Sequence, residues 1–113
     1  MIFRFIQRVR DFFRGIPFGA VRSSKWSQTQ KEHLILEPNC RVCGTIGKLL
    51  NRLNVHHIIP FWKDPSKEND HKNLITLCRI CHFLFGHLKS WFSWNINIKE
   101  DARIMLGKIT NRP

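Results

Sequence analysis

The apolar residues of this chain follow two different periods, which predict helices toward both ends and short strands between them. In residues 2–16 apolar side chains recur at helical spacing between arginines, which predicts a basic amphipathic helix. A second helix is expected up to Leu36, with Ser23 or Ser24 as its N-cap and Pro38 after its end. The chain therefore begins with two helical segments of different character.

The middle of the chain changes to strand-like patterns. The segments "LNVHHII" and "LITLC" are apolar, rich in β-branched residues and separated by a polar loop with two prolines, so they predict a strand pair. The segment "CHFLFGHLKSW" returns to helical spacing, and residues 99–106 predict a last short helix. The predicted fold class is α+β, with a hairpin followed by a helix.

These elements divide the chain into three parts. We expect an N-terminal basic amphipathic extension over residues 1–22, a central domain over residues 23–94, and a C-terminal helix with a basic tail over residues 95–113. A chain of 113 residues with 42% hydrophobic content supports one modest core and is too short for two ordinary domains.

The charge of the chain points to a polyanionic partner. Its formal net charge of +11 exceeds what solubility requires and favours nucleic acid or an anionic membrane surface. The lysines and arginines are spread along the chain, which suits contacts with the phosphates of a duplex. For the N-terminal helix three settings stay open: packing on the core or on a partner such as a second copy, lying on a membrane surface, or touching the DNA backbone.

The location of the protein follows from its apolar runs and its cysteines. No stretch approaches the ~20 apolar residues of a membrane-spanning helix. Arginines interrupt each apolar run near the N-terminus, so a signal-peptide core is not expected. These features favour an intracellular, reducing setting, in which disulfides are rare.

All cysteines fall into two Cys-x-x-Cys pairs, Cys40 with Cys43 and Cys78 with Cys81. Two such pairs supply the four thiolates that a tetrahedral zinc ion requires. Because a four-cysteine shell leaves no coordination position open, the zinc is predicted to be structural. It would hold together the base of the strand pair, which lies between the two pairs in the sequence.

The histidines suggest a second site. His56 and His57 are neighbours on a predicted strand, so their side chains point to opposite faces and are expected to have different tasks. His82 directly follows Cys81, so the zinc cluster would fix where the next helix begins. We expect His33 and His71 to be ordinary surface residues.

Taken in order, "NVHHIIPF", Asn73 within "HKNLITLC", and "CRICH" resemble the signature of HNH endonucleases. The two cysteine pairs resemble the zinc-containing branch of that family. The resemblance covers about residues 24–94, and "CHFLFGHLKSW" is similar to small HNH proteins of phages and bacteria. It implies a ββα-metal hairpin and helix, flanked by further helices, that cleaves DNA phosphodiesters with a divalent metal.

Carried over to this chain, the resemblance implies a role for each matched residue. His57 corresponds to the general base that activates water, and His56 to a ligand of the catalytic metal. Asn73 corresponds to the residue that pins the hairpin loop, and His82 to the second metal ligand. The catalytic ion would be Mg²⁺, Mn²⁺, Ni²⁺ or Zn²⁺, and imidazole, with an unperturbed pKa of ~6.5, suits proton acceptance near neutral pH.

His87 departs from the family pattern. Some members carry a third histidine four residues after the position of His82, on the same helix face. Here the spacing is five, which at ~100° per residue turns His87 away unless a distortion at Gly86 brings it back. His87 is therefore either a third ligand, a phosphate contact or a solvated residue.

Three functions are compatible with the sequence. The first is an HNH endonuclease that nicks or cuts double-stranded DNA, which a homodimer could do on both strands. The second is a zinc-stabilised DNA-binding module without nuclease activity. The third is a protein whose N-terminal helix binds a membrane or a partner. Retention of His57, Asn73 and His82 together favours the enzyme.

Overall fold

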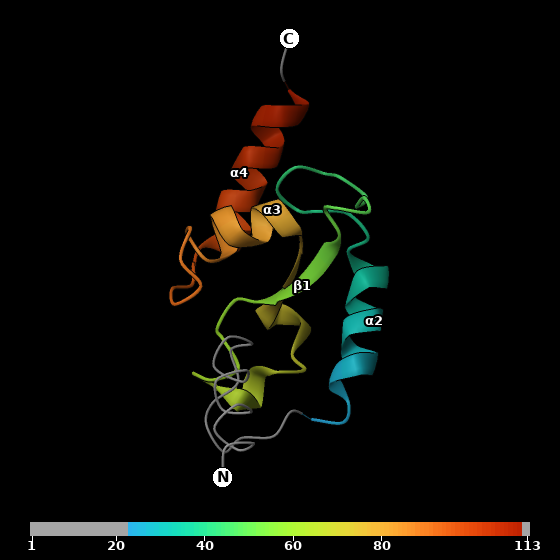
Figure 1. Cartoon of the computed structure of the whole chain (residues 1–113), viewed down its shortest axis with the longest axis vertical. Helices are drawn as coiled ribbons and strands as arrows, with labels where there is room; N and C mark the ends of the chain where they lie inside the picture. Colours follow the sequence, from blue (N-terminus) through green and yellow to red (C-terminus); the bar gives the residue numbers. More distant parts are fainter. Residues whose placement is uncertain (1–22, 112–113) are drawn as a thin grey trace.

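The computed structural model describes residues 23–111, so the helix predicted over residues 2–16 lies outside the described residues. Helix α2 (Trp26–Leu36) lies along one side of a two-stranded hairpin (Figure 1). Helix α4 (Ile98–Thr110) lies above the hairpin in Figure 1. A short helix α3 (Arg79–Cys81) follows the hairpin and continues directly into a single π-helical turn (His82–Gly86). The α+β prediction is confirmed.

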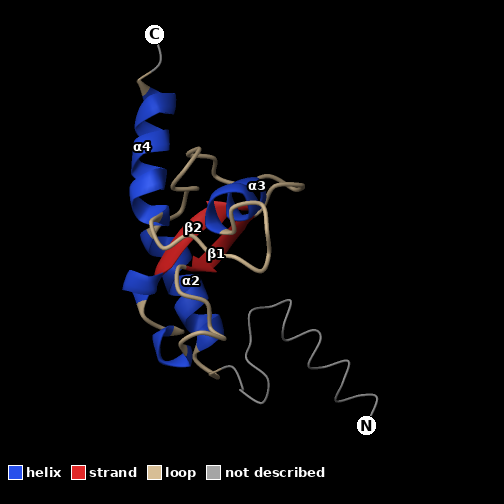
Figure 2. Ribbon diagram, turned by 90° about the vertical axis from the view of Figure 1, so that its left-hand side faces the viewer, coloured by secondary structure: helices blue, strands red, loops and turns tan. Residues whose placement is uncertain are grey.

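The hairpin consists of strands β1 (Leu53–His57) and β2 (Leu74–Cys78), which pair antiparallel. Leu53 lies opposite Cys78 and His57 lies opposite Leu74, so the cysteine end and the histidine end of the hairpin are separate. Both strands are those expected from the apolar pattern. Figure 2 shows the two strands side by side with α3 close to them.

The core lies between the hairpin, the cysteines and α4. It is formed by buried side chains from residues 40–102, among them Val42, Ile58, Ile75, Leu77, Ile98 and Ala102. Ile98 and Ala102 place one face of α4 in this core. Removal of these apolar side chains from water is the main source of stability in so small a domain. Helix α4 therefore shares a core with the hairpin.

The prediction that His33 is an ordinary surface residue is wrong. Its side chain is buried, with 3% of the residue exposed. Its Nε2 lies 2.7 Å from Glu37 Oε1 and its Nδ1 lies 3.1 Å from His71 Nδ1. Because both ring nitrogens have partners, the cost of burying the imidazole is offset. Glu37 Oε1 also accepts a hydrogen bond of 3.1 Å from Thr76 N, which joins the end of α2 to β2.

Other boundaries differ from the expected ones in detail. Helix α2 begins at Trp26, and Ser23 Oγ accepts a hydrogen bond from Lys25 N without capping the helix. The loop between the strands contains two short 3₁₀ turns, Pro65–Lys67 and His71–Asn73, each capped by an aspartate side chain. Helix α4 is longer than the predicted residues 99–106. Among residues 23–111, no helix has the length and apolarity needed to cross a bilayer.

Candidate metal centres and active site

The four cysteines meet at the base of the hairpin. Their sulfur atoms all lie within 4.8 Å of one another, and Cys43 Sγ lies 3.8 Å from Cys78 Sγ. Four sulfurs placed tetrahedrally at 2.3 Å from a zinc ion would be about 3.8 Å apart. The cysteine cluster therefore has the dimensions of a structural zinc site, as the paired spacing predicts.

The thiols of this cluster are electrostatically unequal. A hydrogen bond with Cys81, helped by backbone amides, lowers the pKa of Cys40 to about 4 against the opposing effect of burial. The same hydrogen bond, together with burial, raises the pKa of Cys81, and burial raises that of Cys43. These contacts favour the thiolate form of Cys40, and a divalent cation would displace thiol protons from the cluster.

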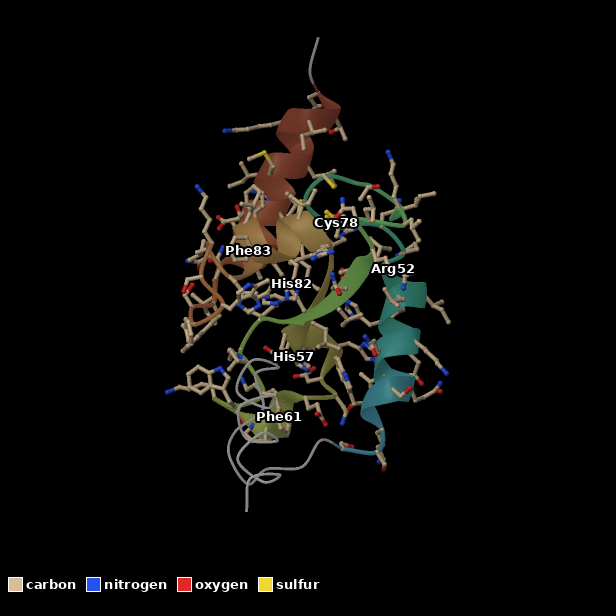
Figure 3. All side chains as sticks on the ribbon, in the orientation of Figure 1. Arg52, His57, Phe61, Cys78, His82 and Phe83 are labelled. Carbon is tan, nitrogen blue, oxygen red and sulfur yellow. The ribbon has the colours of Figure 1, made fainter. Side chains whose placement is uncertain are left out.

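A second cluster is formed by His56, His82 and His87. One ring nitrogen from each lies within 4.8 Å of the others, and His82 Nε2 lies 3.2 Å from His87 Nε2. The three rings meet edge to face or tilted, with centroids 4.8–4.9 Å apart. Nitrogens held tetrahedrally at ~2.0 Å from a metal would be about 3.3 Å apart. We refer to these three residues as the histidine triad; in Figure 3, His82 lies beside the middle of the hairpin.

A π-helical turn brings His87 into the triad. His87 N donates a hydrogen bond to His82 O at 3.1 Å, across five residues in place of the usual four. This wider turn compensates for the spacing that would otherwise rotate His87 away. Gly86 makes room for it, because a Cβ there would lie 3.2 Å from His56 Nε2 and 3.3 Å from His82 Cδ2.

The triad is electrostatically suited to a cation. Burial lowers the pKa of all three imidazoles, to about 4 for His82, and their mutual proximity lowers the pKa of His56 and His82 further. At neutral pH the rings are therefore uncharged and each offers a lone pair. His56 Nε2 is fully buried and has no hydrogen-bond partner within residues 23–111. A metal bound by all three nitrogens would satisfy this buried atom.

His57 points away from the triad, as its neighbouring position on the strand requires. Its ring lies 4.4 Å from that of Trp26, and its Nε2 lies 3.0 Å from the backbone oxygen of Glu68. A carbonyl oxygen can only accept a hydrogen bond, so Nε2 of the neutral His57 ring carries the proton and Nδ1 carries the lone pair. His57 is close enough to the triad that, when it is protonated, its charge lowers the pKa of His82.

Asn73 ties the two ends of the loop together. Its Oδ1 accepts a hydrogen bond of 2.8 Å from Ile59 N, and its Nδ2 donates to Ile59 O at 3.0 Å and to Lys67 O at 3.4 Å. The side chain is buried, so these bonds are shielded from water. They hold the chain immediately after His57, which fixes where that imidazole lies.

Three residues around the triad carry no signal in the sequence. Ser93 O lies 2.8 Å from His87 Nδ1, which directs the Nε2 lone pair of His87 toward the other two rings. Asn95 Nδ2 donates to Phe85 O at 3.1 Å and to Asp101 Oδ2 at 2.7 Å, which connects the π-turn to α4. The ring of Trp91 contacts two rings of the triad, at 4.8 Å from that of His87 and 5.5 Å from that of His82. The five-residue spacing around Gly86 was the one available hint of this arrangement.

A hairpin and helix that hold a histidine cluster beside a four-cysteine cluster define a small ββα-metal domain. Residues 40–84, less than half of the chain, match the family model described as HNH endonuclease, so this segment is similar to HNH endonuclease domains. Comparison with curated proteins and with solved structures found no match. Because the HNH family consists generally of nucleases, the match supports a nuclease-type function that acts on DNA.

Proposed function

We propose that this protein is a metal-dependent endonuclease that hydrolyses phosphodiester bonds of double-stranded DNA. The observation that carries the proposal is the neighbouring placement of a partly buried histidine triad and of His57, whose Nε2 lies against the backbone oxygen of Glu68. The family match over residues 40–84 and the net charge of +11 support a nucleic-acid substrate.

His57 is the proposed general base. Its Nε2–H is held by the backbone oxygen of Glu68, so Nδ1 accepts the proton from the attacking water. The oxygen of that water forms a bond to phosphorus as the bond from phosphorus to the 3′-oxygen breaks. The contact between the His57 and Trp26 rings limits rotation of the imidazole during this step. Removal of the imidazole removes the proton acceptor and leaves the triad in place.

The proposed ligands of the catalytic metal are His56, His82 and His87. A bound cation supplies positive charge to the phosphate and to the departing 3′-oxygen. The ligand set itself discriminates among cations, because imidazole nitrogens suit Zn²⁺ and Ni²⁺, whereas Mg²⁺ prefers oxygen ligands. Of the ions that the family resemblance allows, we therefore expect Ni²⁺ or Zn²⁺ to support more activity than Mg²⁺.

The cysteine cluster and Asn73 have positioning roles in this proposal. A zinc ion on Cys40, Cys43, Cys78 and Cys81 would fix the start of α3 and with it the direction of His82. Asn73 holds the segment that follows His57 through its hydrogen bonds to Ile59. Both act on the geometry of the site through other residues.

The test is plasmid nicking with the zinc-loaded protein and Mg²⁺, Mn²⁺, Ni²⁺ or Zn²⁺ in turn. The parent should convert supercoiled plasmid to nicked or linear product, and His57→Ala should lower the rate at least ~100-fold, the usual size of a general-base effect. His57→Ala should bind Ni²⁺ as the parent does, whereas His82→Ala should lose both Ni²⁺ binding and activity.

Two results would contradict the proposal in different ways. A parent that binds duplex DNA but cuts it with none of the metals would be a zinc-stabilised DNA-binding module. If His57→Ala cuts as fast as the parent, the protein is a nuclease but the proton acceptor is another group.

A further inference from the structure

An exposed tight turn of leucines lies between the first cysteine pair and β1. Lys48 N donates to Asn51 O at 3.1 Å and Asn51 N donates to Lys48 O at 3.0 Å, so Leu49 and Leu50 form the apex. These two residues are 79% and 83% exposed. Neither leucine has a positive φ, so the turn tolerates most residue types and does not itself require leucine. Two large apolar side chains exposed to water at its apex therefore indicate a binding partner. We call residues 48–51 the leucine turn.

The surroundings of the leucine turn are cationic. Arg79 N donates to Arg52 O at 2.9 Å and Ile80 N donates to Asn51 Oδ1 at 3.0 Å, which joins the start of α3 to the turn. Lys48, Arg52 and Arg79 are exposed, and within residues 23–111 none of them forms an ion pair. Residues 38–63 and 71–99 contain no Asp or Glu. The apolar apex therefore has a rim of free positive charge.

This charge selects among possible occupants. A second copy docked by two-fold symmetry would bring Lys48, Arg52 and Arg79 against the same cations of its partner. Residues 1–22, with five arginines and one aspartate, are cationic as well. Neither a second copy nor residues 1–22 would be attracted by the positive charge around the leucine turn, whereas a polyanion would be.

We propose that the leucine turn enters a groove of duplex DNA, with Leu49 and Leu50 against the bases and the three cations on flanking phosphates. This inference rests on the proposed endonuclease function, because it assumes that the leucine turn and the histidines contact the same DNA duplex. The turn lies beyond the cysteine end of β1 and His57 lies at the other end (Figures 1 and 3). A five-residue strand spans about 13 Å, a separation that is short compared with a DNA duplex. Apolar side chains that enter a groove unstack a base step and bend the DNA.

The test measures binding of an intact duplex that contains 2-aminopurine, whose fluorescence rises on unstacking, by His57→Ala protein that does not cut it. The matched variant adds Leu49→Asn and Leu50→Asn, which suit a tight turn and keep the fold. We expect about tenfold weaker binding and loss of the fluorescence rise, with an unchanged salt dependence because the phosphate contacts remain. Arg52→Gln should lower the slope of log affinity against log salt by about 0.9.

Ile35→Asn is the control, since Ile35 is 79% exposed but lies on α2. It should leave the fluorescence rise and the affinity unchanged. Equal fluorescence with and without the leucines would overturn the proposal. The proposal would also be overturned if the leucine variant kept its DNA binding but lost binding to phosphatidylserine vesicles, because a membrane would then be the occupant. The same holds if the variant kept its DNA binding but no longer formed dimers in sedimentation, because a second copy would then be the occupant. This test measures DNA binding and not cleavage. A parent protein that cannot nick plasmid would therefore contradict the proposed endonuclease function but would leave the proposed role of the leucine turn to be decided by the binding test.

Discussion

The backbone amide of His87 donates a hydrogen bond to the carbonyl oxygen of His82, five residues earlier, and the Nε2 atoms of the two rings lie 3.2 Å apart. The wide turn depends on Gly86, where a Cβ would lie 3.2 Å from two atoms of the His56 ring. Gly86→Ala should therefore displace His56 and weaken Ni²⁺ binding by roughly tenfold, as a positioning change around a metal ligand does. Calorimetric titration of the zinc-loaded protein with Ni²⁺ measures this effect.

Gly107→Ala is the matched control. Gly107 lies within α4, and a Cβ there would meet no atom within 4 Å. This variant should bind Ni²⁺ like the parent and gain up to about 1 kcal/mol in free energy of unfolding, because alanine favours the helix. Unchanged Ni²⁺ affinity in Gly86→Ala would show that the position of His56 does not depend on the glycine.

Metal binding by the triad should depend only weakly on pH above pH 5.5. Burial lowers the pKa of His56, His82 and His87, so protons begin to compete only as pH falls toward these lowered values, about 4 for His82. Three histidines with ordinary pKa values of ~6.5 would together lose several hundred-fold in affinity between pH 7 and 5.5. We expect a loss below about tenfold in Ni²⁺ titrations, with zinc content measured at each pH as the control. A hundredfold loss would mean that the metal-free rings are exposed to water.

Loss of one cysteine should destabilise the domain as much as removal of zinc. Cys78 ends β2, and its Sγ lies 3.8 Å from Cys43 Sγ and accepts a hydrogen bond from Cys81 N. Cys78→Ser should lower the free energy of unfolding by more than about 3 kcal/mol, because binding of the ion is coupled to folding. Urea unfolding, with and without a chelator, checks this prediction.

The two perturbations should not add. If the cysteines hold zinc, the chelator should lower the stability of the parent to that of Cys78→Ser and affect the variant little. Equal losses in both proteins would assign the chelator effect to another site.

Asn73→Ala should separate activity from metal binding. The substitution removes hydrogen bonds to Ile59 and Lys67 and takes these partners from the half-buried backbone N and O of Ile59. We expect a loss of about 2–3 kcal/mol in stability and a marked fall in plasmid nicking, because the segment after His57 is released. Ni²⁺ affinity should stay unchanged, since these contacts do not involve the triad.

Asn97→Ala is the control for that loss. Asn97 is exposed and its side chain forms no cap hydrogen bond at the start of α4. Its removal should change stability by less than about 0.5 kcal/mol. Normal nicking by folded Asn73→Ala protein would show that Asn73 has a purely structural role.

The local features of the fold were predictable because they depend on neighbouring residues. The two strands follow from their apolar, β-branched segments, and the cysteine cluster follows from two repeated Cys-x-x-Cys pairs. The burial of His33 was not predictable, because its distant partner His71 reaches it only when α2 packs on the loop. Ser93 and Asn95 were missed for the same reason, since their contacts are made by the folded backbone.

The sequence by itself determined the chemistry of this protein: four thiols in two pairs, adjacent histidines on a strand, and an excess of positive charge. Tertiary structure decided the geometry. Whether His87 joins His56 and His82 depends on a π-turn whose energy is set by the packing of Gly86 on His56 and by the contact of Asn95 with α4. Residue type and spacing are local properties, whereas the direction of a ring depends on which backbone groups and side chains surround it after folding.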